Sequence, residues 1–212
     1  MLIALANPKG GVGKSTISVH LASLAHERGR RVALIDADAQ QSSSNWLKAL
    51  GQPFGAAHGF RDPDELIERI DSIVDSAELT VADGPAGLSE ITRVLIMAAD
   101  LVLMPCGPSA MGLHALQSAL RVVRHAQKIR KGQPKAVLVP NKLQANFRLS
   151  RELIEASAEL GIPNVDGLRL RQAYADAYGQ GTVVWRLGRS GEDAAQEFSR
   201  LYSQVEQHTP HA

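Results

Sequence analysis

Short runs of hydrophobic residues alternate along the chain with longer stretches in which hydrophobic and polar residues repeat at helical spacing. The hydrophobic runs predict buried strands at residues 2–6, 31–35, 79–82, 101–105 and 136–140, with a weaker candidate at 165–170. The amphipathic stretches predict helices at residues 15–28, 63–75, 89–99, 112–129, 149–160 and 192–207. This alternation predicts an α/β fold with a doubly wound, mainly parallel sheet and helices on both faces.

The alternation continues along the chain without a break. It therefore predicts a single domain over residues 1–207, with residues 208–212 as a disordered tail. The single cysteine, Cys106, excludes an internal disulfide framework and a zinc site made of several cysteines. Because no apolar run reaches the roughly 18 residues of a membrane-spanning helix, and no leader segment is visible, we expect a cytoplasmic protein.

A glycine-rich loop carries the strongest chemical signal in the sequence. Residues 7–16 read NPKGGVGKST and lie between the first predicted strand and the first predicted helix. Glycines let the backbone curl so that successive N–H groups face phosphate oxygens at the positive end of the helix. In such a loop Lys14 reaches the β- and γ-phosphates, and the Ser15 hydroxyl binds Mg²⁺. The residues predicted to bind the nucleotide are Gly10, Gly11, Val12, Gly13, Lys14, Ser15 and Thr16.

Acidic residues follow the second and third predicted strands. Asp36 and Asp38 come after the second strand, and Asp83 comes after the third. Side chains at the carboxyl ends of parallel strands face the crevice in which such sheets bind ligands. Phosphoryl transfer needs neutralised phosphate charge and a water molecule held in line, so carboxylates at these places suit the binding of metal and water.

The way in which the loop departs from the usual phosphate-binding pattern points to one family. Pro8 stands where the strict motif has glycine, and an additional lysine, Lys9, begins the run KGGVGKST. This run resembles the deviant Walker A box of the ParA/MinD family of ATPases. Residues 101–108 and 171–181 also resemble later ParA segments, so the resemblance covers nearly the whole chain. Because the chain starts at its first strand, it is similar to the small ParA proteins without an N-terminal helix-turn-helix domain.

The resemblance implies roles for the polar residues of the loop and of the strand ends. Lys9 would cross a dimer interface to the partner's nucleotide, which places it with Lys14 and Asp38 among the catalytic residues. Asp38 would orient the attacking water. Asp83 would be the Walker B acid that holds Mg²⁺ together with Ser15, and Asp36 would support the metal shell.

A further residue of the predicted site follows the last strong strand. The family commonly reads the nucleotide base at this position, so the resemblance implies that Asn141 contacts the base. The sequence lacks the Asn-Lys-x-Asp motif of guanine-specific enzymes, because Gln144 stands in place of the aspartate. Adenine is therefore favoured, and the implied cofactors are ATP and Mg²⁺.

The formal net charge of +1 hides an uneven distribution of charge. Residues 101–151 contain nine Lys and Arg residues and no Asp or Glu, whereas residues 62–100 contain ten acidic and two basic residues. Within the basic stretch Arg121, Arg124 and Lys128 recur at three- and four-residue spacing, which places them on one face of a helix. Such a face predicts non-specific binding of double-stranded DNA through phosphate contacts. Arg171 stands where the family often has a DNA-contacting arginine.

Together these features favour a ParA-type ATPase that forms an ATP-dependent homodimer and binds DNA non-specifically. The resemblance implies that a ParB-like or cargo-adaptor protein stimulates ATP hydrolysis, and that the cargo is a plasmid, a chromosome or a protein assembly. It also implies association with the nucleoid and no membrane partner.

Two alternatives share the predicted fold. A MinD-like membrane-cycling ATPase would end in a basic amphipathic helix, but Glu192, Asp193, Glu197 and Glu206 outnumber Arg200 in the last predicted helix. A metabolic ligase of the dethiobiotin-synthetase type would need a pocket for a small acid. The additional loop lysine and the acid-free basic stretch argue against the ligase.

Overall fold

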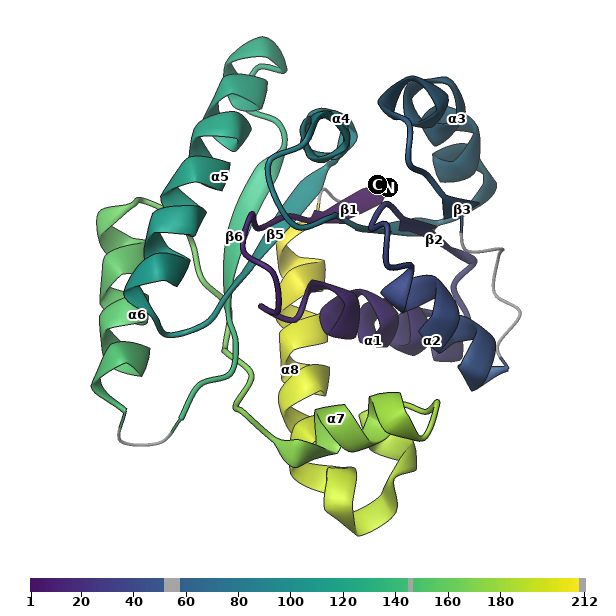
Figure 1. Cartoon of the computed structure of the whole chain (residues 1–212), viewed down its shortest axis with the longest axis vertical. Coiled ribbons are helices and arrows are strands. Elements are labelled where there is room, and N and C mark those ends of the chain that lie inside the picture. Colours follow the sequence, from purple (N-terminus) through teal and green to yellow (C-terminus); the bar gives the residue numbers. More distant parts are fainter. Residues whose placement is uncertain (52–57, 145–146, 210–212) are drawn as a thin grey trace.

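A six-stranded parallel sheet forms the centre of the computed structural model, which describes residues 1–51, 58–144 and 147–209 (Figure 1). Its strands are β1 (Leu2–Leu5), β2 (Val32–Asp36), β3 (His58–Gly59), β4 (Leu79–Asp83), β5 (Leu101–Cys106) and β6 (Lys135–Pro140). They lie in the order β3-β2-β4-β1-β5-β6, and every pairing in the sheet is parallel. The carboxyl ends of all these strands therefore lie along one edge of the sheet.

Helices cover both faces of the sheet (Figure 1). They are α1 (Lys14–Glu27), α2 (Ser42–Leu50), α3 (Pro63–Ser76), α4 (Glu90–Ala98), α5 (Ala110–Ile129), α6 (Arg148–Glu159), α7 (Gln172–Gly179) and α8 (Glu192–His208), with 3₁₀ turns at Val184–Arg186 and Gly188–Gly191. Helices α1, α2, α7 and α8 lie on one side, and α3, α4, α5 and α6 lie on the other. This arrangement confirms the predicted doubly wound α/β architecture.

Alternating side chains of each strand enter two separate hydrophobic cores. In β1, Ile3 and Leu5 pack into the core with α1 and α8, whereas Leu2 and Ala4 pack into the core with α3, α4 and α5. Both faces of a central parallel strand are buried in this way, which is why its sequence reads as an unbroken hydrophobic run. The five strong hydrophobic runs of the sequence all become strands of this sheet.

The remaining helix and strand predictions had mixed outcomes. The six predicted helices all form, with ends within two residues of the predicted ones. The weak strand candidate at 165–170 is wrong, because that segment makes one isolated bridge, at Arg169, and the neighbouring Asn164 makes another. It appeared strand-like because Val165 and Leu168 are buried against the core that contains α8. Hydrophobic patterning did not predict β3, which has two residues, or the short helices α2 and α7.

The C-terminal helix packs on the sheet through its apolar face. The side chains of Phe198, Leu201, Tyr202 and Val205 form its apolar stripe, and all four are buried. Helix α8 extends through His208, one residue into the predicted tail, and residues 210–212 of that tail lie outside the described residues. Within the described ranges, none of the helices is both long and apolar enough to span a membrane.

Candidate functional site

The glycine-rich loop connects β1 to α1 at the carboxyl edge of the sheet, as predicted. The side chain of Asn7 fixes the start of the loop: its Nδ2 donates to the carbonyl of Pro105 on β5 (2.7 Å), and its Oδ1 accepts from the backbone N–H of Lys9 (2.8 Å). Asn7 is fully buried. The loop is therefore anchored to two neighbouring strands before the first glycine.

Gly13 is the residue from which α1 begins, and its backbone conformation requires glycine. Its φ of 96° lies in the left-handed region, which L side chains avoid. A Cβ atom at this position would also overlap the Nδ2 atom of Asn141, which lies directly against the loop. The glycine thus serves both the turn and the close approach of Asn141.

Asn141 holds the phosphate loop from the end of β6. Its Nδ2 donates to the carbonyl of Val12 (2.7 Å), and its Oδ1 accepts from the backbone N–H of Lys142 (2.8 Å). The neighbouring Lys142 ammonium donates to the carbonyl of Gly11 (2.7 Å). Asn141 lines the cavity, as a base contact would, but in this structure its amide group is committed to the loop.

The side chain of Lys14 is buried and lies along the inside of the loop. Its Nζ donates to the carbonyls of Asn7 (3.1 Å) and Lys9 (3.3 Å). Burial lowers the pKa of Lys14, and the negative charges of Asp83 and Asp38 oppose that shift. The three predicted residues are therefore close enough to interact electrostatically, although they come from three different parts of the chain.

Asp83 and Ser15 meet the requirements of a magnesium site. Asp83 ends β4 and is fully buried, and neither carboxylate oxygen has a hydrogen-bond partner among the described residues. Burial raises the pKa of Asp83 to about 7, and the charge of Asp36 adds to the rise. The charge of Lys14 and the nearby hydroxyls of Ser15 and Ser43 oppose it, although neither hydroxyl is in hydrogen-bond geometry with the carboxylate. Buried polar atoms without partners are rare, and a hydrated metal ion would supply the missing donors. The residues present thus fit Mg²⁺ held by Ser15 and Asp83.

The other two predicted carboxylates have different surroundings. The carboxylate of Asp36 is buried and accepts from the backbone N–H of Ser44 (2.8 Å) and of Asp38 (3.2 Å), so it fixes the start of α2. Asp38 lies in the loop that follows β2, lines the cavity and accepts from the backbone N–H of Gln40 (2.9 Å). Asp38 lies beside the phosphate loop, and its water-orienting role stays a prediction. The carboxylate of Asp36 holds the backbone of the loop on which Asp38 lies.

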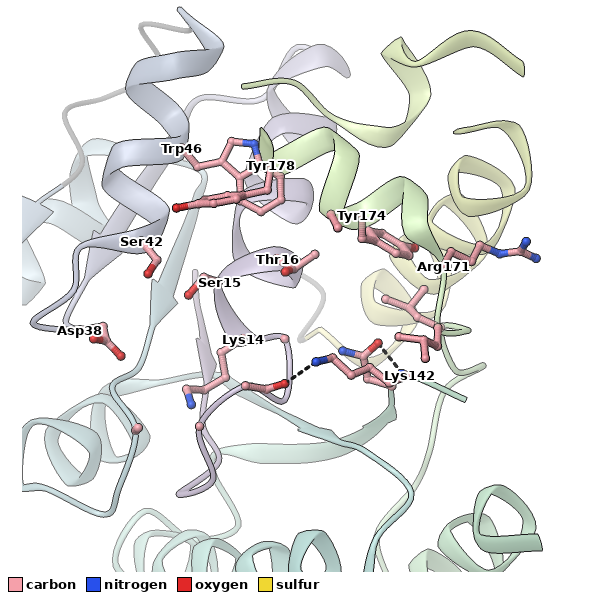
Figure 2. Close-up of a pocket in the computed structure, with 18 of the residues that line it drawn as sticks. Lys14, Ser15, Thr16, Asp38, Ser42, Trp46, Lys142, Arg171, Tyr174 and Tyr178 are labelled. Carbon is pink, nitrogen blue, oxygen red and sulfur yellow. Dashed lines mark hydrogen bonds between the residues drawn. The ribbon is translucent and has the colours of Figure 1, made fainter. Parts of the chain in front are cut away.

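A cavity of about 490 Å³ opens beside the phosphate loop. Figure 2 shows Lys14, Ser15 and Asp38 at one end and three aromatic residues, Trp46 and Tyr178 with Tyr174, along the far wall. Trp46 and Tyr178 meet edge to face with ring centroids 5.1 Å apart.

The sequence did not identify this aromatic wall. In the sequence, residues 171–181 resemble a ParA segment and include the predicted DNA contact Arg171, but their tyrosines carry no signal of a cavity wall. Trp46 lies on the unpredicted helix α2. The cavity is large enough for a nucleotide, with a polar end for phosphates and an apolar wall for a base.

Arg171 lies at the edge of the cavity, but its guanidinium points away from it, toward α8 (Figure 2). There it donates to Glu197 (2.7 and 3.1 Å) and to Asp193 (2.8 Å). Two carboxylates thus compensate its charge, and its contacts in this structure join α7 to α8. The predicted DNA contact by Arg171 would have to compete with these ion pairs.

Lys9 and the three predicted DNA-binding residues of α5 do not line the cavity. The Lys9 ammonium donates to the hydroxyl of Ser109 (3.0 Å) at the start of α5. Arg121, Arg124 and Lys128 are exposed along α5, away from its buried stripe, which includes Leu116, Leu120 and Val123. The predicted amphipathic arrangement of this helix is therefore confirmed, and DNA binding stays a prediction.

Comparisons with known proteins agree with this geometry. A family model described as the CobQ/CobB/MinD/ParA nucleotide binding domain matches residues 3–184. Maintenance of carboxysome distribution protein A from Halothiobacillus neapolitanus is 30% identical over 207 residues, which cover 96% of this chain and 95% of that protein.

Solved structures of low sequence identity share the fold. The ATP complex of an McdA variant from Cyanothece matches with a TM-score of 0.79 at 16% identity, over 98% of this chain and 95% of that one. The Mg-ADP complex of the septum site-determining protein MinD from Pyrococcus horikoshii matches with a TM-score of 0.75 at 19% identity, over 96% and 95%. The chain belongs to the CobQ/CobB/MinD/ParA family of nucleotide-binding proteins.

Proposed function

We propose that this protein is a ParA-type positioning ATPase. ATP and Mg²⁺ are its cofactors, ATP drives formation of a homodimer, and the dimer binds double-stranded DNA without sequence preference. The observation that carries the proposal is the KGGVGKST loop, which the fold places beside Asp38 and the buried carboxylate of Asp83. Hydrolysis, stimulated by a ParB-like or cargo-adaptor protein, would dissolve the dimer and release the DNA.

A protein assembly is the cargo that the relatives favour. The carboxysome distribution protein matches this chain over nearly the full length of both, so the similarity is not confined to the phosphate loop. A plasmid or a chromosome is the alternative cargo of the same mechanism. Both kinds of cargo require the DNA-bound dimer, which places the protein on the nucleoid.

The DNA surface that we propose is the polar face of α5. Arg124 donates to the carbonyl of Leu160 (2.8 Å) at the end of α6, and Arg121 donates to Ser118 (3.1 Å), so neither is held by a carboxylate among the described residues. Lys128 follows one turn later. Positive charges that carry no ion pair are available to phosphate groups, and each contact releases counterions from the DNA.

A charge-reversal series tests this surface. The triple variant Arg121→Glu, Arg124→Glu, Lys128→Glu should bind duplex DNA more weakly. In a plot of the logarithm of the binding constant against the logarithm of the salt concentration, its slope should flatten by about 0.9 for each phosphate that the protein no longer neutralises. The control is Arg61→Glu, Arg69→Glu, Arg93→Glu, which makes the same change of net charge at exposed positions in and beside the acidic stretch. Both are measured by fluorescence anisotropy with Mg²⁺ and ATP. Equal weakening by the two variants would show that only net charge matters and would contradict the proposed surface.

The nucleotide assignment has its own test. Lys14→Ala should abolish ATP binding in isothermal titration calorimetry, because it removes the buried ammonium that faces the phosphates. Lys9→Ala should keep ATP binding by the monomer but lose the ATP-dependent dimer in size-exclusion chromatography. Submicromolar ATP affinity in Lys14→Ala would refute the phosphate-loop assignment, and a normal dimer in Lys9→Ala would refute the cross-dimer role.

A further inference from the structure

The backbone of Lys9 is fixed in the phosphate loop by two hydrogen bonds. Its N–H donates to Oδ1 of the buried Asn7 (2.8 Å), and its carbonyl accepts from the Lys14 ammonium (3.3 Å). Both polar groups of the Lys9 main chain are therefore held inside the phosphate loop. Any movement of the ammonium to another partner must come from rotation of the side chain.

In this structure the ammonium contacts Ser109, which lies 100 residues along the chain. The distance from Lys9 Nζ to Ser109 Oγ is 3.0 Å. The same hydroxyl oxygen accepts from the backbone N–H of Gly112 (3.0 Å) and so caps the start of α5. Gly112 makes this possible, because a Cβ atom there would approach the Gly107 carbonyl to 2.8 Å and the hydroxyl of Ser109 to 3.0 Å.

The surroundings make this contact weak enough to break. The first turn of a helix carries a partial positive charge, so a lysine ammonium beside the start of α5 is electrostatically disfavoured. None of the contacts found for Lys9 Nζ among the described residues is with a carboxylate. The contact with a neutral hydroxyl holds the side chain without satisfying its charge, and phosphate groups would attract the ammonium more strongly.

We propose that Ser109 is a positioning residue that holds Lys9 against its own chain in the monomer and releases it when the ATP-dependent dimer forms. This inference rests on the proposed dimer. In the dimer the Lys9 ammonium would turn to the partner's nucleotide, so the contact with Ser109 exists in the monomer alone. A contact made in one state only shifts the equilibrium toward that state. Ser109 therefore opposes dimerisation until ATP supplies a stronger partner for the lysine.

Substitutions at position 109 separate this role from helix capping. Ser109→Ala removes both the acceptor for Lys9 and the cap of α5, whereas Ser109→Thr keeps a hydroxyl for both. The matched control is Ser89→Ala, because Ser89 caps α4 by accepting from Thr92 N–H (3.3 Å) and has no contact with Lys9. Ser89→Ala therefore loses a cap of the same chemistry and leaves the Lys9 contact in place.

The first measurement concerns the nucleotide-free monomer and needs no dimer. Lys9 is acetylated with an amine-reactive reagent, and the product is measured by peptide mass spectrometry. The reaction should be roughly threefold faster in Ser109→Ala than in the wild type, because a partly exposed hydrogen bond to a charged group protects the amine by about that factor. Ser109→Thr and Ser89→Ala should label at the wild-type rate. Unchanged labelling of Lys9 in Ser109→Ala would overturn the proposed contact.

The second measurement is sedimentation of the same variants with Mg²⁺ and a non-hydrolysable ATP analogue. Because both protomers break the contact, Ser109→Ala should lower the dimer dissociation constant by roughly tenfold. Ser109→Thr should restore the wild-type value, and Ser89→Ala should not change it. An unchanged constant in Ser109→Ala, or an equal change in Ser89→Ala, would overturn the holding role. Absence of any dimer in the wild type would overturn the proposed function instead, and the labelling experiment would still decide the contact between Lys9 and Ser109.

Discussion

At the scale of single residues, the phosphate loop is held both by its own glycines and by side chains from the end of β6. The amide of Asn141 and the ammonium of Lys142 hold the carbonyls of Val12 and Gly11, so the end of β6 supports the loop at two successive residues. These contacts orient the loop before any phosphate arrives. Preorganised donors of this kind stabilise bound anions without a cost of rearrangement at the moment of binding.

Two loop glycines allow a matched test of this support. Both Gly11 (φ 71°) and Gly13 (φ 96°) have left-handed backbones, but only at Gly13 would a Cβ atom meet Asn141. Gly11→Ala should lower the free energy of unfolding by about 1 kcal/mol through backbone strain, and Gly13→Ala by about 3 kcal/mol through strain and overpacking together. Urea denaturation of the nucleotide-free protein measures both. Equal losses would mean that the close approach of Asn141 is not rigid.

At the scale of elements, α7 is tied to α8 by one buried carboxylate. Glu197 accepts from Nε and a terminal nitrogen of Arg171, and from the backbone N–H of Arg169 (3.3 Å). Its side chain is 8% exposed, whereas that of Asp193, the second partner of Arg171, is 70% exposed. Because α7 carries Tyr174 and Tyr178 of the cavity wall, this tie also positions the aromatic residues.

The difference in burial predicts unequal effects of removing the two acids. Glu197→Ala should lower the free energy of unfolding by about 2 kcal/mol, because it leaves a partly buried guanidinium and a backbone N–H without their acceptor. Asp193→Ala should cost less than about 0.5 kcal/mol, since water screens an exposed pair. Thermal and urea denaturation should both show this order. A larger loss from Asp193→Ala would contradict the structural role assigned to Glu197.

At the scale of the whole molecule, His20 joins elements that are far apart in the sequence. It is fully buried on α1, where its ring meets the rings of Trp46, Tyr174, Trp185 and Phe198 at centroid distances of 5.1–5.5 Å. Its Nε2 accepts from the backbone N–H of Val184 (3.2 Å), so Nδ1 carries the proton and donates to the carbonyl of Thr16 (2.8 Å). One neutral histidine thus connects the nucleotide site with α8.

This burial makes the stability of the fold dependent on pH. Burial lowers the pKa of His20 from 6.5 to about 4. Between pH 6.5 and pH 4, the histidine is protonated in the unfolded chain but not in the folded chain. The free energy of unfolding therefore falls as the pH decreases, and the loss reaches about 3 kcal/mol at pH 4. His20→Gln should lose this part of the pH dependence, while the control His114→Gln, on the surface helix α5, should keep it. The test is urea denaturation from pH 7.5 to pH 4, and parallel pH profiles for His20→Gln and the wild type would contradict the assignment.

Much of the fold and the phosphate end of the site followed from the sequence. The glycines, Lys14 and Ser15 are contiguous, and their place between a strand and a helix defines their geometry locally. Asp38 and Asp83 were predictable because parallel strands bring their carboxyl ends to one edge. The aromatic wall was not predictable, since Trp46 and Tyr178 come from two short helices whose sequences carry little periodic signal.

The individual strands and helices of the sheet, the phosphate loop and the basic face of α5 are specified by the amino-acid pattern alone, because each depends on residues within a few positions of one another. The three-dimensional fold was needed to establish which distant groups meet: Asn141 with Val12 across 129 residues, and Lys9 with Ser109 across 100. These pairings depend on strand order, which places β5 beside β1 and β6 beside β5. Hydrophobic periodicity reports which face of an element is buried, but it does not report which element lies against it.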